Sequence, residues 1–282
     1  MEYQKPVNFF SYMGGKHLLA KTIVKLIPQH KRYVEPFGGS GKVLFAKAPS
    51  EIEVINDADK KIANLFYCVA FHFDEFWHKA KWLLHSREIL KVFETQIIPS
   101  PPAVLGDVNH AIATYYALKS CFSGKGGFAY EIKNSSESKM VTKGVLTLRA
   151  IRKRLKYVII EAKDFEDLMR RWDTEETFFY CDPPYFGAEH YYDIPFTKRD
   201  HERLLSLLKQ TKGKWILSGY HNELYATALK GYPYIEKQIS KSSYGVTQSS
   251  KNKTRPLATE VLWFNFDPDK ETLKELKLEL VI

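Results

Sequence analysis

Short apolar segments rich in β-branched and aromatic residues recur along the chain and are separated by amphipathic segments. The apolar segments have the length of β-strands, and we expect strands at residues 33–35, 52–56, 157–161, 177–181, 214–218 and 261–266. Between most of them the pattern is helical, as at residues 198–209, where leucines gather on or near one face. Strands that alternate with helices predict an α/β fold with a parallel sheet.

One long segment breaks this alternation. From about Ala58 to Leu155 the pattern is mostly helical, with a proline-rich stretch at 99–102 and a glycine-rich stretch at 124–127. We interpret this segment as an insertion between two strands. The predicted sheet domain therefore comprises residues 1–57 and 156–282, and the predicted inserted domain comprises residues 58–155.

The size and composition of the chain narrow the class of protein. With 282 residues and 44% hydrophobic content, the chain can bury the core of one large domain, or of one domain that carries an insertion. The N-terminus lacks a charged segment followed by an apolar one, and no apolar run approaches the roughly 20 residues that span a bilayer. We therefore expect a cytoplasmic protein without a membrane partner.

The cysteines and histidines give no sign of a metal site. Cys68, Cys121 and Cys181 lie far apart, no C-x-x-C spacing occurs, and no H-E-x-x-H pattern is present. This distribution indicates neither a disulfide framework nor bound zinc. We expect no metal cofactor and assign no histidine a catalytic role.

Positive charge is concentrated in two internal segments. Residues 119–156 carry a net charge of +8 and residues 237–255 a net charge of +5, in a chain whose total is +9. Both segments also contain aromatic residues. Clustered basic and aromatic side chains indicate a surface that binds a polyanion such as nucleic acid, and the alternative is a solvated charged face.

A glycine-rich turn follows the first predicted strand. Its residues are Glu35, Pro36, Phe37, Gly38, Gly39, Ser40 and Gly41. We expect a helix to begin just after it, near Lys42. Glycines let the backbone approach a ligand closely at the carboxyl end of a strand, where open α/β sheets bind nucleotides. A tight turn without a ligand is the alternative.

The next predicted strand ends at Asp57. An acidic residue at this place can accept hydrogen bonds from both ribose hydroxyls of an adenosyl group. The same carboxylate is also suited to cap a helix that starts at Ala58, and the two roles are compatible. Together, the glycine-rich turn and Asp57 predict that a nucleoside binds at the carboxyl edge of the sheet.

The most specific motif is Asp182-Pro183-Pro184-Tyr185, which follows the strongly apolar strand at 177–181. The Asp182 carboxylate and the Pro183 carbonyl can each accept one hydrogen of an aromatic amine such as N6 of adenine. Holding both hydrogens favours a more tetrahedral nitrogen, whose lone pair can then attack a methyl group. Tyr185 offers a ring on which the purine can stack, worth about 1–3 kcal/mol. A Pro-Pro turn that ends a strand is the alternative.

Several motifs together resemble the Dam-type, D12 class of N6-adenine DNA methyltransferases, through almost the whole chain. In chain order they are Phe10-x-Tyr12-x-Gly14-Gly15-Lys16, the glycine-rich turn, Asn56-Asp57, Asp164-Phe165 and Asp182-Pro183-Pro184-Tyr185. Two later segments look like further landmarks of the class: Phe196-x-x-x-Asp200-His201-x-x-Leu204 and Glu260-Val261-Leu262.

The resemblance implies a Rossmann-like methyltransferase sheet with an inserted, mostly helical target-recognition domain, and S-adenosyl-L-methionine as the cofactor. The implied catalytic residues are Asp182, Pro183 and Tyr185. The implied cofactor-binding residues are Tyr12, Gly15, Lys16, Glu35, Pro36, Phe37, Gly39, Gly41, Asp57, Asp164, Phe165 and Asp182. The expected substrate is double-stranded DNA, from which the enzyme must rotate the target adenine out of the stack.

Two groups of residues are expected to contact the DNA. Phe122, Lys125 and Tyr130 flank glycines in a segment that falls where relatives reading GATC carry their base-reading hairpin. Arg149, Arg152 and Lys153 lie in a predicted helix at the end of the insertion and are suited to bind phosphates. The hairpin segment looks shorter than in those relatives, so GATC specificity does not follow from it.

Other functions fit the sequence less well. Methylation of cytosine C5 requires a cysteine nucleophile, commonly in a Pro-Cys pair, and no such pair is present. Enzymes that methylate cytosine N4 usually begin the motif with Ser, so Asp182 favours adenine. RNA as substrate is a weaker alternative, which an assay on matched DNA and RNA duplexes would separate. A non-catalytic DNA-binding protein is a further alternative, and it should have lost the ability to bind the cofactor.

Overall fold

The computed structural model describes residues 2–4, 9–10, 16, 19–120, 138–187, 189, 194–240 and 257–281, with the backbone alone at 138–146 and at Ser240. Within this part of the chain, seven strands form one sheet in the order β3-β2-β1-β4-β5-β7-β6. The strands are β1 (Arg32–Glu35), β2 (Ile52–Asn56), β3 (Val158–Glu161), β4 (Thr177–Cys181), β5 (Lys214–Gly219), β6 (Tyr234–Ser240) and β7 (Leu257–Phe264). Strands β1 to β5 are parallel, as predicted, and β7 runs antiparallel between β5 and β6.

Helices cover both faces of the sheet, because its central strands are apolar on both sides. All five residues of β4 are buried: Phe178 and Tyr180 join one core, and Phe179 and Cys181 join the other. The first core includes α1 (Ala20–Leu26) and α10 (Lys270–Leu276). The second includes α7 (Phe165–Trp172), α8 (Lys198–Gln210) and α9 (Glu223–Ala228).

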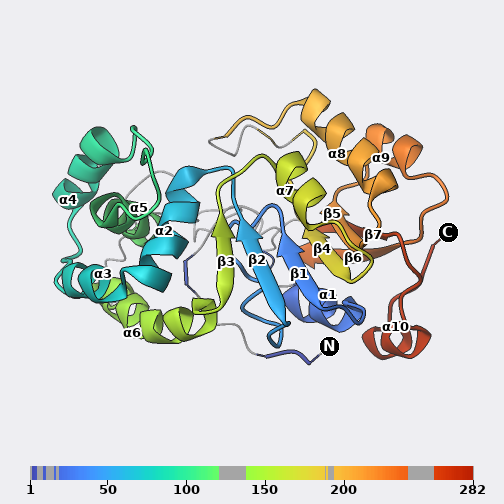
Figure 1. The fold of residues 1–282 in the computed structure, drawn as a ribbon, viewed down its shortest axis with the longest axis horizontal. Coiled ribbons are helices and arrows are strands. Elements are labelled where there is room, and N and C mark those ends of the chain that lie inside the picture. The colour runs from blue at the N-terminus through green and yellow to red at the C-terminus, as the bar shows by residue number, and fades with distance from the viewer. Residues whose placement is uncertain are drawn as a thin grey trace, which may run out of the picture.

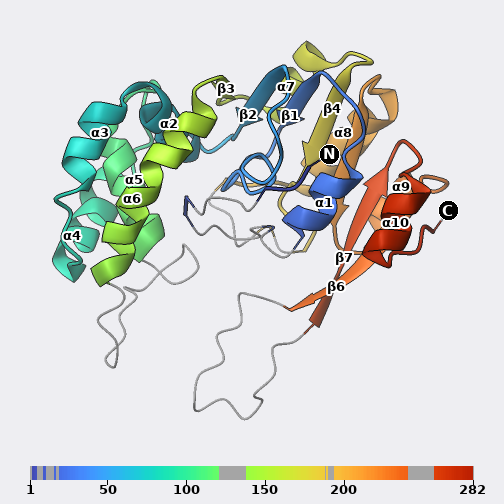
Figure 2. The ribbon, with the colours of Figure 1, turned by 90° about the horizontal axis from the view of Figure 1, so that it is seen from below.

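The segment between β2 and β3 is helical, and Figure 1 shows it gathered beyond the β3 edge of the sheet. Its elements are α2 (Lys60–Phe71), α3 (Phe73–Ala80), α4 (Arg87–Val92), the π-helical turn η1 (Phe93–Ile97), α5 (Val108–Ser120) and α6 (Ser138–Leu155). Figure 2 shows α6 beside α3 and α5. Helix α2 packs on α5, α6 and β3, so the helical segment shares the first core with the sheet.

The helix predicted near Lys42 is wrong. Successive turns run from Lys42 to Ala46, with the Phe45 amide bonded to the Gly41 carbonyl. The chain leaves the helical path at Lys47, which forms a bridge with Tyr3 and is completely buried. These long-range contacts outweigh the local helical pattern.

Strand β6 was not predicted, and its sequence explains why. It is the edge strand of the sheet, and three consecutive polar residues separate its apolar side chains Ile235 and Ile239. Strand β7 ends at Phe264, two residues before the predicted end.

No helix among the described residues is long and apolar enough to cross a membrane.

Candidate active site

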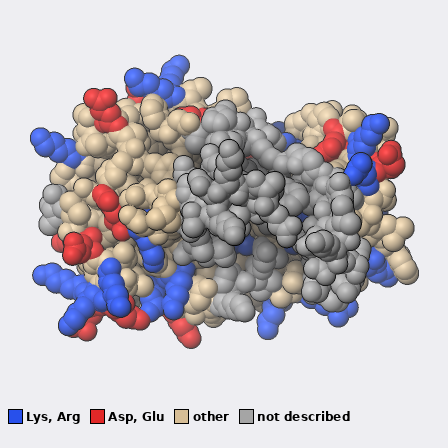
Figure 3. Space-filling model, turned by 180° about the vertical axis from the view of Figure 1, so that it is seen from behind, with Lys and Arg blue, Asp and Glu red and all other residues tan. Residues whose placement is uncertain are grey.

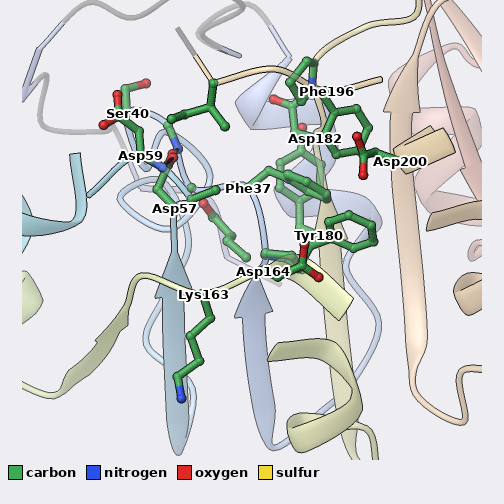
Figure 4. A pocket seen from close by; sticks show the side chains of 18 of the residues that line it. Phe37, Ser40, Asp57, Asp59, Lys163, Asp164, Tyr180, Asp182, Phe196 and Asp200 are labelled. Carbon is green, nitrogen blue, oxygen red and sulfur yellow. Dashed lines mark hydrogen bonds between the residues drawn. The ribbon is translucent and has the colours of Figure 1, made fainter. Parts of the chain in front are cut away.

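A cavity lies at the carboxyl ends of β1, β2 and β4 and beside the loop after β3 (Figure 4). It encloses about 1050 Å³ of empty space, part of it open to solvent. Nine residues predicted for the cofactor line it: Lys16, Glu35, Pro36, Phe37, Gly39, Asp57, Asp164, Phe165 and Asp182. Motifs that are far apart in sequence thus meet at one edge of the sheet, as expected for strand ends in an open α/β fold.

The glycine-rich turn needs its glycines for steric reasons. Gly39 and Gly41 have φ of 48° and 65°, in the left-handed region that residues with a side chain rarely adopt. A Cβ atom at Gly38 would come within 2.6 Å of the Ile55 side chain. Gly41 does not line the cavity, but its amide closes the turn by donating to the Gly38 carbonyl at 2.8 Å.

Asp57 links this turn to the end of β2. Its Oδ2 accepts the Gly39 amide at 2.8 Å, and its Oδ1 accepts the Asp59 amide at 2.9 Å. Burial raises the pKa of Asp57 to about 7, against the opposing effect of these hydrogen bonds. The predicted helix cap is wrong in position: α2 begins at Lys60, and Asp59 caps it by accepting the Lys61 amide.

Glu35 lines the cavity and is buried. Its Oε1 accepts the hydroxyl of Tyr33 at 2.6 Å. Burial raises the pKa of Glu35 to about 7, although the Tyr33 hydrogen bond acts in the opposite direction. The carboxyl group therefore changes charge near neutral pH and adds little fixed charge to the cavity.

Three aromatic rings form one wall. The ring centroid of Phe37 lies 5.4 Å from that of Phe165 and 5.6 Å from that of Phe196. Asp164 caps α7 through the Glu166 amide and pairs with Arg203 at 2.8 Å. The wall is apolar with a carboxylate at its edge, which suits a flat heterocycle that also donates hydrogen bonds.

The predicted catalytic motif lies against Lys16. The Lys16 ammonium is 2.8 Å from Oδ1 of Asp182 and 4.5 Å from the centre of the Tyr185 ring. The Tyr185 hydroxyl donates a hydrogen bond to Glu260. Burial raises the pKa of Asp182, and Lys16 opposes this shift. Pro183 and Tyr185 are buried and do not line the cavity, while Pro184 does.

Sequence reasoning missed several residues of the site. Tyr180, Pro195, Phe196 and Asp200 line the cavity but were not assigned to it. Phe196 and Asp200 belong to a motif that the sequence had already singled out, so a signal for them existed. Tyr180 looked like one apolar residue among many in a buried strand. The predicted residues Tyr12, Gly15, Phe122, Lys125 and Tyr130 lie outside the described residues.

Asn56 ties the strand ends together. Its amide nitrogen donates to the carbonyls of Pro36 and Lys163, at 2.8 Å and 3.0 Å, and its Oδ1 accepts the Lys163 amide at 2.8 Å. One buried side chain therefore holds the turns after β1 and β3 beside the end of β2. Figure 4 shows the side chain of Lys163 pointing away from the other labelled residues.

The basic residues of α6 lie elsewhere. Arg149 and Arg152 stack over aromatic rings of α3, Arg149 over Trp77 at 4.9 Å and Arg152 over Phe73 at 4.7 Å. Helix α6 leads into the amino end of β3, whereas the cavity lies at the carboxyl ends of the strands. The exposed Lys153 shares this end of the helix, so the structure does not bring these residues to the cavity.

Charge on the described surface is mixed rather than uniform. On the face in Figure 3, Lys and Arg gather toward the end that carries α10, with Asp and Glu among them. No group of three or more His, Cys, Asp or Glu residues suited to a metal ion occurs in the described ranges. The carboxylates of the cavity are instead engaged by backbone amides, Lys16 and Arg203.

Comparisons with known proteins agree on one family. The model of the family described as D12 class N6 adenine-specific DNA methyltransferase matches residues 12–242. The chain is 24% identical to Type II methyltransferase M1.LlaDCHI of Lactococcus lactis subsp. cremoris, over 92% of this chain and 95% of the relative. It is also 24% identical to the retron Ec67 DNA adenine methylase of Escherichia coli, over 93% and 95%.

A DNA adenine methylase of Vibrio cholerae is 23% identical, over 89% of this chain and 94% of the relative. These alignments span both the sheet and the helical segment between β2 and β3. Since the family match also covers most of the chain, this protein belongs to the D12 class of N6 adenine-specific DNA methyltransferases.

Proposed function

We propose that the cavity binds S-adenosyl-L-methionine and an adenine rotated out of duplex DNA, and that Asp182 directs transfer of the methyl group to N6. One observation carries this proposal: Asp182 at the end of β4 opens into the same cavity as the glycine-rich turn and Asp57. A nucleoside cofactor and a reacting base can therefore share one site. The roles that we propose for the other residues follow from the chemistry of their side chains.

The residues of the cavity fit the cofactor. Each Asp57 oxygen accepts one backbone amide, and an ionised carboxylate has about four acceptor positions, so two remain for ribose hydroxyls. Phe37, Phe165 and Phe196 offer an apolar wall for an adenine ring, with Asp164 at its edge. When bound, the cofactor supplies a methyl group on a positively charged sulfur.

The reacting adenine is held by acceptors. Asp182 and the Pro183 carbonyl each accept one N6 hydrogen, which directs the nitrogen lone pair toward the methyl group. Proline presets the direction of the carbonyl because its φ is restricted. Tyr185 supplies a ring beside Asp182, against which the base packs. Lys16 contributes positive charge near the carboxyl group of the cofactor.

The helical segment at residues 58–155 is proposed as the target-recognition domain. In this assignment Phe122, Lys125 and Tyr130 read or wedge against bases, while Arg149, Arg152 and Lys153 contact phosphates at a distance from the cavity. Rotating the adenine out of the duplex costs a few kcal/mol, which phosphate contacts help to offset.

The test is methyl transfer from labelled cofactor to duplex DNA by Asp182→Asn. This change keeps the shape of the side chain and removes the negative charge that holds the amine. We expect the rate to fall by at least about 100-fold, the lower range for a positioned proton-accepting group. Asp167→Asn on the exposed first turn of α7 is the matched control and should keep the wild-type rate.

The same assay discriminates between substrates. Equal methylation of a matched RNA duplex would contradict DNA as the substrate, and near wild-type transfer by Asp182→Asn would contradict the catalytic assignment. Unchanged thermal unfolding of Asp182→Asn would show that the loss comes from the site and not from the fold.

A further inference from the structure

Glu260 enters the site from the antiparallel strand. Because β7 runs opposite to β5, its early residues lie at the carboxyl end of the parallel strands, where Val261 pairs with Gly219. Glu260 precedes this pair and is 4% exposed. The reversed direction of β7 thus brings a carboxylate beside residues that precede it by more than 70 positions.

Glu260 has two contacts in the catalytic cluster. It accepts the hydroxyl of Tyr185 at 2.5 Å, and its Oε2 lies 4.0 Å from the Lys16 ammonium. The Tyr185 ring also packs edge to face on Tyr220, with centroids 4.6 Å apart. One buried carboxylate therefore fixes the hydroxyl end of the ring that lies beside Asp182.

Lys16 stands between the buried carboxylate of Glu260 and that of Asp182, whose side chain is 18% exposed. The Lys16 ammonium is 2.8 Å from Asp182 and 4.0 Å from Glu260, and the lysine side chain is 4% exposed. An adenine amine that donates to Oδ1 of Asp182 competes with this ammonium for that oxygen. A buried ammonium that loses a carboxylate partner is costly, and Glu260 is the protein carboxylate already beside it.

We propose that Glu260 is a positioning residue that receives the Lys16 ammonium when Asp182 accepts the adenine amine, and that it holds Tyr185 beside the base throughout. This inference rests on the proposed function of Asp182. The exchange requires only a small movement of a flexible side chain toward Glu260. No covalent bond is formed or broken. The ion pair of Lys16 with Glu260 replaces the ion pair of Lys16 with Asp182, while the adenine amine donates a hydrogen bond to Asp182.

The two groups that the proposal places beside Glu260 also favour the ionised form of its carboxyl group. Burial raises the pKa of Glu260, and Lys16 and the Tyr185 hydroxyl act to lower it. The charge on Glu260 is therefore favoured by the two groups that the proposal assigns to it. Asp182 is subject to the same two influences, so the carboxylates share one ammonium.

The test measures what the adenine amine contributes to binding. Duplexes with adenine or with purine, which lacks the amine, at the mapped target position are compared by fluorescence anisotropy with S-adenosylhomocysteine present. The ratio of the two dissociation constants reports the contact between the amine and Asp182. This readout requires no methyl transfer, so it remains measurable in inactive variants.

We expect Glu260→Gln to reduce the preference for adenine at least about fivefold, because Lys16 then stays on Asp182. In a Lys16→Met background the same change should alter the preference by less than about twofold. Glu260→Asp should restore part of the preference. Glu236→Gln is the matched control, because Glu236 lies on the neighbouring strand and contacts His221.

Equal losses from Glu260→Gln in both backgrounds would overturn the inference, since the effect would not pass through Lys16. An unchanged preference in Glu260→Gln would overturn it as well. Failure of the proposed function has a different signature, because Asp182→Asn would then keep both transfer and the preference for adenine.

Discussion

The guanidinium of Arg154 contacts both carboxylate oxygens of Glu53 and so joins the last turn of α6 to the start of β2. It also donates to the Leu44 carbonyl at 3.0 Å. Glu53 has a second cationic partner in Lys47, whose ammonium lies 4.3 Å from the centre of the Tyr33 ring. This charged cluster lies at the amino end of β2, and it attaches the helical segment to the strands that carry the site.

Arg154 is therefore expected to contribute to stability. Arg154→Ala removes hydrogen bonds to a buried carboxylate, and we expect a loss of about 1.5–3 kcal/mol in the free energy of unfolding. Urea denaturation of the full chain measures this loss. The neighbouring exposed Lys153→Ala should change stability by less than about 0.5 kcal/mol. Equal stability of the two variants would show that the cluster does not support the fold.

The exposed cations of α6 make a separate prediction about DNA. If Arg149, Arg152 and Lys153 contact phosphates, each change to Ala weakens binding equally on all sequences and lowers the salt slope by about one unit. Binding titrations at several salt concentrations measure the slope. Lys274→Ala on α10 serves as the control. An unchanged slope in the triple variant would show that these side chains do not contact phosphates.

Much of the sheet could be predicted because its strands are apolar on both faces. The strand at 177–181 was predicted with its observed bounds, and the motif after it indicated the family that the comparisons then confirmed. Strand β6 escaped prediction because three polar residues separate its two isoleucines, so its sequence lacks the regular alternation of a half-buried strand. The helix near Lys42 failed because its end is determined by contacts with Tyr3 and Glu53 that local sequence does not contain.

The residues of the site likewise divide into those that local sequence predicts and those that only the fold brings together. Asp57 and Asp182 could be found because each directly follows a strand whose carboxyl end is a usual place for ligands. The meeting of Lys16 with Glu260 depends on the antiparallel insertion of β7, which periodicity does not predict. Arg154 looked like one more basic residue of a helix, and only its position over Glu53 separates it from its neighbours.

Site preference should depend on the segment that contains Lys125 and Tyr130. We expect Lys125→Ala or Tyr130→Ala to change which adenines are methylated, or how fast, more than cofactor affinity, because both lie far along the chain from the cofactor motifs. Genome-wide mapping of methylated adenines compares each variant with the wild type. Identical motifs and rates would place specificity elsewhere in the helical segment.

Asp57 should make cofactor binding depend on pH near neutrality. Burial raises its pKa to about 7, so the free enzyme carries a protonated Asp57 at lower pH. Ribose hydroxyls donate more strongly to the ionised form, and binding below this pKa must therefore release a proton. We expect affinity to weaken as pH falls from 8 to 6, by up to about tenfold per unit below the pKa.

Asp57→Asn separates this effect from that of Glu35, whose pKa is also raised to about 7. The variant should bind the cofactor about 1.5–3 kcal/mol more weakly at pH 8, the usual value of hydrogen bonds to a charged group. It should also lose most of the dependence on pH, because the neutral amide does not titrate. Calorimetry at pH 6, 7 and 8 measures both quantities. A variant that keeps the wild-type pH dependence would assign the titration to Glu35, and unchanged affinity at pH 8 would remove Asp57 from the ribose site.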